Sequence, residues 1–100
     1  MKYQENGTIE DNAHLQGDYY RVDIRSPKIA KAVAPGQFVH MRLPVFEHRV
    51  LRRPFSIFNA DDPAGVLSIV YKVVGEGTTH LSRLGRGTQA NLLGPLGVGA

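Results

Sequence analysis

The feature that most constrains the fold is a series of short runs of alternating apolar and polar residues, each stopped by proline or glycine. The clearest run alternates Tyr20, Val22 and Ile24 with charged or polar residues, the period-two pattern of a half-buried strand. In so short a chain, a closed or nearly closed antiparallel barrel is the economical way to hide strand edges. The sequence therefore predicts an all-β fold of six strands. We expect these strands at residues 2–15, 19–25, 38–43, 54–59, 66–74 and 88–93.

The expected strands differ in regularity. Residues 2–15 alternate only loosely, which suggests a long edge strand broken near Gly7. Residues 66–74 are dense in β-branched and apolar side chains and predict a central strand. Residues 45–51 show no strong period, so we expect a surface loop that brings arginines to the start of the next strand.

Helical signals are sparse. Leu81 and Leu84, three residues apart, predict one short helix that a preceding threonine caps and Gly85 ends. Residues 28–33 fit either one helical turn or an irregular crossing.

Composition allows a single domain over residues 1–100. With 42% hydrophobic residues, a chain of 100 residues can bury one compact core. No stretch is apolar for long enough to span a bilayer, and the N-terminus lacks the apolar centre of a signal peptide. The chain also contains no cysteine. We therefore expect a cytoplasmic domain without disulfides.

The net charge of +3 gathers only in one local patch, from His48 to Arg53. Charge-driven binding of nucleic acid usually needs a stripe of lysine and arginine over a whole face. The patch therefore favours a small anionic ligand or a protein partner.

The densest chemistry lies in Arg53-Pro54-Phe55-Ser56. Arginine provides a planar fork for phosphate oxygens, and proline starts an extended segment. Phe55 offers a flat face and Ser56 a hydroxyl group. On residue types alone, a strand that simply follows a basic loop explains the segment about as well as a ligand site does.

A second candidate is the segment Gly75–Thr79, where glycines precede the predicted helix. Free N–H groups at a helix start can bind an anion. His80 stands where a dinucleotide-binding fingerprint would need its third glycine, so the segment is no Rossmann motif. Alone, a glycine-rich helix entry is the simpler interpretation. Together with Arg53, it supplies the two components that a diphosphate needs.

Other chemistry is not indicated, and we predict neither a metal site nor a catalytic side chain. The histidines, at positions 14, 40, 48 and 80, are too dispersed for a metal site. Ser56 and Ser82 lack the context of a serine nucleophile. Asp61 and Asp62 fit a turn, and Glu76 a solvated position.

Three ordered motifs resemble a known family. Arg53-Pro54-Phe55-Ser56 is similar to the Arg-x-aromatic-Ser motif of the ferredoxin reductase-like flavoproteins. The segments 51–57, 70–78 and 93–97 together resemble the electron transfer subunit of class 1B dihydroorotate dehydrogenase. The resemblance is strongest from Pro35 to Gly97 and covers the N-terminal FAD-binding domain of that subunit.

The resemblance implies a six-stranded antiparallel Greek-key barrel with FAD extended outside it. It assigns Arg53 to the diphosphate, Phe55 to the isoalloxazine ring and Ser56 to the N5 edge of that ring. Lys72 stands where the family often has arginine. The cofactor-binding residues that the resemblance implies are Arg53, Pro54, Phe55, Ser56, Val70, Tyr71, Lys72, Gly77 and Thr78.

The family subunit continues into a nicotinamide-binding domain and a cysteine-ligated two-iron cluster, which a chain without cysteine cannot hold. We therefore expect an inactive fragment of an oxidoreductase that passes electrons between NADH and an FMN-containing, dihydroorotate-oxidising subunit in pyrimidine biosynthesis. Another ferredoxin reductase-like subunit, such as that of a sulfide dehydrogenase, is a near alternative. An alternative of another class is a small non-enzymatic barrel that binds RNA or protein through its basic loop.

Overall fold

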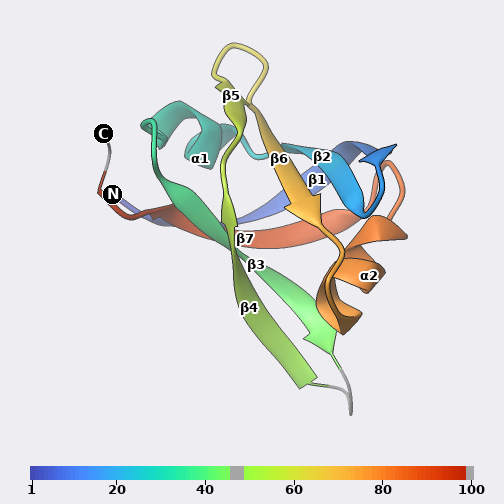
Figure 1. Ribbon diagram of the computed structural model, residues 1–100. Helices are drawn as coiled ribbons and strands as arrows, with labels where there is room; N and C mark the ends of the chain where they lie inside the picture. Colours follow the sequence, from blue (N-terminus) through green and yellow to red (C-terminus); the bar gives the residue numbers. More distant parts are fainter. Residues whose placement is uncertain (46–48, 99–100) are drawn as a thin grey trace.

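The chain forms one curled antiparallel sheet of seven strands in a computed structural model, which describes residues 1–45 and 49–98 (Figure 1). The strands are β1 (Tyr3–Gln16), β2 (Tyr19–Arg25), β3 (Phe38–Val45), β4 (Arg49–Ser56), β5 (Asn59–Asp61), β6 (Val66–Lys72) and β7 (Gln89–Leu96). Across the sheet they follow the order β4-β3-β7-β1-β2-β6-β5, so several neighbours are far apart in the chain. The prediction of an all-β, antiparallel, barrel-like fold is confirmed, with the sheet curled into a half-barrel.

The count of six strands was one too low because the segment expected at residues 54–59 belongs to two strands. β4 already begins at Arg49, paired with β3, and β5 follows after Ile57 and Phe58. At this break the chain changes partner: Ile57 N donates to Gln37 O, whereas Phe58 N donates to Ser68 O on β6. The prediction of a loop at residues 45–51 is thus wrong for Val45, which ends β3, and for Arg49 to Leu51, which belong to β4. Residues 46–48, His48 included, lie outside the described part.

β1 is neither broken near Gly7 nor an edge strand. It runs for 14 residues and pairs with β7 through its first half and with β2 through its second. A Cβ atom on Gly7 would lie 2.5 Å from the side chain of Ile24. Glycine at this position therefore permits close packing of β1 rather than ending it.

Two short helices accompany the sheet in the described part of the chain, whereas one was expected. α1 (Pro27–Ala32) settles the open choice at residues 28–33 in favour of a helical turn, with proline in its first turn. The predicted second helix is α2 (Glu76–Ser82), which begins directly after Gly75 and ends before Leu84. No helix in the described part of the chain has the length and apolar character to cross a membrane.

The carboxylate of Glu5 on β1 caps α1. It accepts a hydrogen bond from the hydroxyl of Ser26. It also accepts hydrogen bonds of 3.2 Å from the backbone N–H groups of Lys28 and Ile29. Ser26 and the side chain of Ile29 are fully buried. This charged cap satisfies donors that the first helical turn leaves open and fixes α1 against the sheet.

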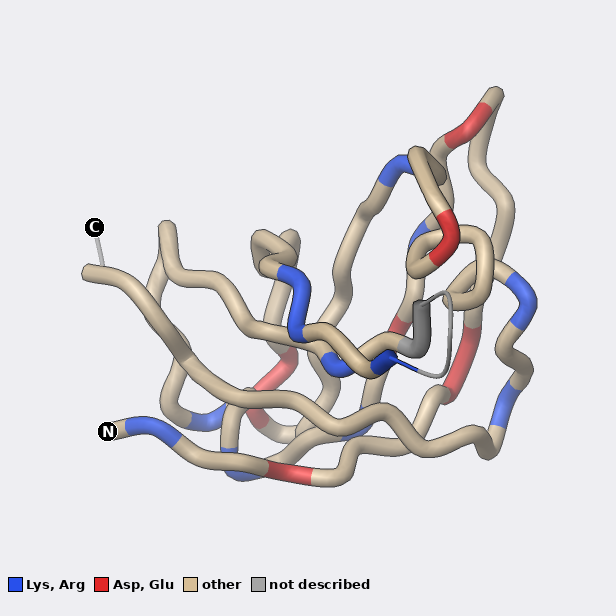
Figure 2. The backbone as a smooth tube through the Cα atoms, turned by 90° about the horizontal axis from the view of Figure 1, so that it is seen from below, with Lys and Arg blue, Asp and Glu red and all other residues tan. Residues whose placement is uncertain are grey.

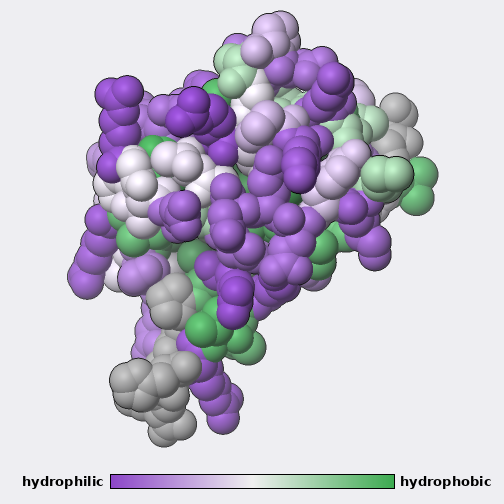
Figure 3. Space-filling model, turned by 180° about the vertical axis from the view of Figure 1, so that it is seen from behind, coloured by the Kyte–Doolittle hydropathy of each residue, from purple (hydrophilic) through white to green (hydrophobic). Residues whose placement is uncertain are grey.

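The core fills the concave side of the curled sheet, and the face seen in Figure 3 presents mostly hydrophilic residues. Alternation places Leu67, Ile69 and Tyr71 of β6 inward. β6 pairs with both β2 and β5, which agrees with an internal strand. The other fully buried large side chains are Ile9, Val22, Ile24, Ile29, Val39, Met41, Leu43, Leu81 and Leu92.

We predict that Glu5→Ala lowers the free energy of unfolding by about 1.5 to 3 kcal/mol, because it leaves the donors of α1 without their charged acceptor. Glu10→Ala on the same strand is the matched control. Glu10 forms an ion pair with Arg25 at 3.1 Å in which both side chains are partly exposed, so its loss should cost about 1 kcal/mol or less. Urea unfolding measures both changes, and equal losses would contradict the capping role.

The buried hydroxyl of Tyr71 makes stability depend on alkaline pH. Burial raises the pKa of Tyr71 to about 12, although its hydrogen bond to Asn12 acts in the opposite direction. In the unfolded chain a tyrosine loses its proton near pH 10. Because the folded state keeps this proton to a higher pH than the unfolded state does, the free energy of unfolding should stay constant below about pH 10. It should then fall by about 2 kcal/mol between about pH 10 and 12.

Urea unfolding at several alkaline pH values measures this loss. Tyr71→Phe should flatten the pH dependence, whereas the exposed Tyr19 offers a control, and Tyr19→Phe should keep the wild-type slope. A Tyr71→Phe variant with the unchanged slope would show that another group is responsible.

Candidate functional site

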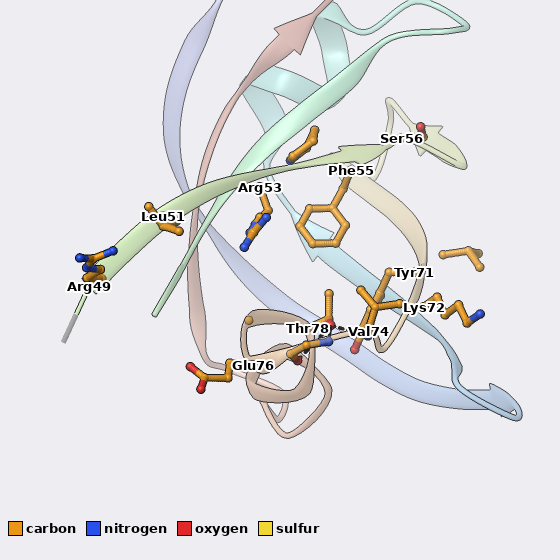
Figure 4. A pocket seen from close by; sticks show the side chains of 14 residues that line it. Arg49, Leu51, Arg53, Phe55, Ser56, Tyr71, Lys72, Val74, Glu76 and Thr78 are labelled. Atoms are coloured by element: carbon orange, nitrogen blue, oxygen red, sulfur yellow. Dashed lines mark hydrogen bonds between the residues drawn. The ribbon is translucent and has the colours of Figure 1, made fainter. Parts of the chain in front are cut away.

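β4, β6 and the segment that leads into α2 surround an open cleft of about 780 Å³ (Figure 4). A cleft of this size falls within the range of small-molecule and cofactor sites. Its walls come from segments that are far apart in the sequence and meet because the sheet curls. The lining residues are Arg49, Leu51, Arg53, Pro54, Phe55, Ser56, Val70, Tyr71, Lys72, Val74, Gly75, Glu76, Gly77 and Thr78.

All nine residues predicted to bind a cofactor line this one cleft, although their individual roles stay predictions. Sequence reasoning missed Arg49 and Leu51, which share a face of β4 with Arg53 and Phe55. No signal in the sequence marks them, because the residues before Arg53 show no period-two pattern. Val74 and Glu76 also line the cleft. The sequence indicated no role for Val74 and only a solvated position for Glu76.

The wall formed by β4 combines charge with an aromatic ring. Arg53 and Phe55 extend from the same side of β4 toward α2 (Figure 4). The guanidinium of Arg53 is exposed and has no ion-pair or hydrogen-bond partner among residues 1–45 and 49–98. Phe55 is only 8% exposed, with its ring edge-on to Tyr71 at 6.2 Å between centroids. Ser56 lies at the end of β4, away from Arg53 (Figure 4).

β6 provides the second wall. Tyr71 is buried and donates its hydroxyl to Asn12 Oδ1 at 2.9 Å, so its ring is held in place. Val70 is half-buried and Lys72 exposed. The ammonium of Lys72 lies 5.9 Å from the centroid of the Tyr19 ring, and its side chain points away from Arg53 (Figure 4).

The segment Val74–Thr78 closes the third side. Thr78 Oγ1 accepts hydrogen bonds from the N–H groups of Val74 at 2.9 Å and Gly75 at 3.2 Å, and its hydroxyl contacts Gly75 O at 3.3 Å. The Thr78 hydroxyl therefore shapes the turn before α2. The backbone N–H groups of Gly77 and Thr78 belong to the first helical turn, where no earlier carbonyl of the helix can accept them.

The charges suit an anionic ligand with a flat apolar part. Among the described residues that line the cleft are three basic side chains and a single acid, Glu76. The rings of Phe55 and Tyr71 add apolar surface. Lysines and arginines are otherwise distributed over the whole fold (Figure 2), so no stripe typical of nucleic-acid binding appears in the described part of the chain.

The two adjacent arginines of the predicted basic patch, Arg52 and Arg53, lie on opposite faces of β4. Arg52 alternates with Arg53 along β4 and does not line the cleft. Its Nη2 donates to Asn91 Oδ1 at 2.7 Å, and its Nη1 is buried without a hydrogen-bond partner in the described residues. Of the two adjacent arginines, Arg53 lines the cleft and Arg52 does not.

Known proteins with similar sequences include members of the predicted family of electron transfer subunits. The chain is 36% identical over 95 residues to the dihydroorotate dehydrogenase B (NAD⁺) electron transfer subunit of Fusobacterium nucleatum subsp. nucleatum. This match covers 95% of the chain. The same subunit of Desulforamulus reducens is 44% identical over 80 residues. The chain spans only 37% and 30% of the lengths of these two relatives.

Solved structures show the same fold. An NADH-dependent reduced ferredoxin-NADP oxidoreductase superposes with a TM-score of 0.86 at 30% identity, covering 94% of this chain and 33% of that one. The cytochrome b5 reductase domain of Ulva prolifera nitrate reductase superposes with a TM-score of 0.76 at 18% identity, covering 95% and 40%. The second likeness concerns the fold alone.

A family model completes the comparison. The model of the oxidoreductase FAD-binding domain matches residues 7–99, nearly the whole chain. This match includes every strand of the sheet except the first residues of β1, and all residues that line the cleft. The resemblance that the sequence motifs indicated is thus confirmed, and the chain belongs to the family of oxidoreductase FAD-binding domains.

Proposed function

We propose that the cleft between β4, β6 and α2 is the FAD site of this domain. The observation that carries the proposal is the position of Arg53, whose guanidinium has no partner among the described residues and lies on the same cleft as the first turn of α2. A diphosphate needs such a bidentate cation and backbone donors together. The residues present thus fit an FAD diphosphate through the chemistry of their donors.

The remaining walls fit the flavin part of the cofactor. A flavin requires an apolar wall and polar groups at the edge of its ring. Phe55 and Tyr71 provide buried aromatic surface, and the exposed Ser56 provides a hydroxyl group for the N5 edge. Val70 and Lys72 would contribute mainly backbone groups. The bound flavin supplies hydride and single-electron chemistry, and the chain supplies binding, orientation and charge.

For the whole protein, we propose electron transfer between NADH and an FMN-containing, dihydroorotate-oxidising partner in the cytoplasm. Support comes from relatives named as electron transfer subunits at 36% and 44% identity. A two-iron cluster would lie in a part of the protein beyond these 100 residues, since they contain no cysteine. Another ferredoxin reductase-like oxidoreductase is the second candidate, favoured by the TM-score of 0.86 with a ferredoxin-NADP oxidoreductase.

We predict that the purified chain takes up FAD and acquires a yellow absorbance band. Arg53→Ala should weaken this uptake by about 1.5 to 3 kcal/mol, or roughly tenfold to a hundredfold in Kd, because the diphosphate loses a charged hydrogen-bond donor. Arg86→Ala is the matched control, since Arg86 is exposed between α2 and β7 and does not line the cleft. A fluorescence titration with FAD measures both variants.

Two results would count against the proposal. Absence of FAD uptake at high FAD concentration would contradict a cofactor site in this chain. Equal weakening by Arg53→Ala and Arg86→Ala would show that general charge, rather than the cleft, attracts FAD. Salt-sensitive binding of an oligonucleotide without a flavin band would instead favour the small barrel that binds RNA.

A further inference from the structure

Asn12 on β1 lies outside the cleft but bonds to two of the elements that surround it. Its Nδ2 donates to the carbonyl oxygens of Leu81 at 2.7 Å and Leu84 at 2.9 Å, at the C-terminal end of α2. Its Oδ1 accepts the hydroxyl of Tyr71 at 2.9 Å. Both donor hydrogens and the acceptor oxygen of the amide are therefore engaged. Through this side chain, α2 is tied to the β6 wall of the cleft.

A β-bulge aims Asn12 inward. The ladder between β1 and β2 includes Ile9, skips Glu10 and resumes at Asp11. Strict alternation from the buried Ile9 would point Asn12 to solvent. The extra residue reverses the alternation, so Asn12 pairs with the buried Val22 and faces the interior. The position of Asn12 is thus built into the backbone of β1.

α2 depends on such ties because a helix of seven residues has little stability of its own. At its start, the hydroxyl of Thr78 holds the turn that follows β6. Toward its end, Leu81 is fully buried, and Asn12 binds the carbonyl of Leu81 in the last turn and that of Leu84 just after the helix. A displacement of the helix end would move the N–H groups of its first turn, which lie only one turn away.

Tyr71 has support that does not depend on Asn12. Its ring stacks on Tyr20 at 5.7 Å and contacts the edge of Phe55 at 6.2 Å, and the residue is 4% exposed. Loss of the Asn12 amide should therefore displace α2 more than it displaces the aromatic wall.

We propose that Asn12 is a positioning residue for the diphosphate part of the ligand. It holds α2 against the fixed ring of Tyr71 and thereby sets where the first-turn N–H groups lie relative to Arg53. The inference rests on the proposed FAD site. It requires that a substitution of Asn12 weaken the binding of ligands with a diphosphate more than the binding of ligands that have only the flavin ring and ribityl chain.

The test is a pair of fluorescence titrations, with FAD and with riboflavin, on wild type and on Asn12→Asp. Aspartate keeps the size and an acceptor for Tyr71, but it has no N–H donors and its charge is unfavourable beside the carbonyls that end a helix. We expect the Kd for FAD to rise about tenfold and the Kd for riboflavin by less than about twofold. Asn59→Asp, exposed on β5 and outside the cleft, should change neither.

Weakening of both ligands by the same factor, or of neither, in a folded variant would overturn the inference while wild-type FAD binding still supported the site. No FAD binding by the wild type would overturn both. If Asn12→Asp does not fold, the side-chain NH₂ signals of Asn12 in the wild type give the test. FAD should slow their hydrogen exchange more than riboflavin does, and equal exchange in the two complexes would contradict the proposal.

Discussion

The hydrogen bonds of the Asn12 amide connect the three elements on which the cleft depends. β1 supplies the amide and β6 the hydroxyl of Tyr71. The last turn of α2 supplies the carbonyl of Leu81, and the segment just after α2 supplies that of Leu84. Without them the short helix would be held by the buried Leu81, by its packing against β3 and by the turn at Thr78. The bulge at Glu10 that turns Asn12 inward is therefore as much a part of the site as the residues that line it.

The chemistry of the cleft follows from where the sheet ends. β4 is the outermost strand of the described sheet and pairs with β3 along one edge, so its other edge borders the open cleft. Arg53 stays in water there and pays little desolvation, whereas Phe55 on the same face turns toward the core. Charge and apolar wall thus lie next to each other on one strand. This combination fits a cofactor that is anionic in one part and flat and apolar in another.

Local patterns were sufficient for the strands with clear alternation and for the segments that form the cleft. Residues 19–25 coincide with β2 and residues 38–43 fall within β3. Arg53, Tyr71 and Gly77, which three separate segments contribute, all line the cleft. The early start of β4 was missed, because arginine and valine next to a proline show no period until β3 pairs with them. Asn12 gave no signal either, since a bulge changes which residues face inward without changing the composition of the strand.

The central claim is that FAD lies in this cleft with its diphosphate between Arg53 and the start of α2. The most direct measurement is an NMR titration of the ¹⁵N-labelled chain with FAD. The account predicts the largest shifts at the backbone amides of Gly77 and Thr78 and at the Arg53 side chain, with little change at α1. Shifts that gather at α1, or that leave Gly77 and Thr78 unchanged while FAD binds, would contradict it.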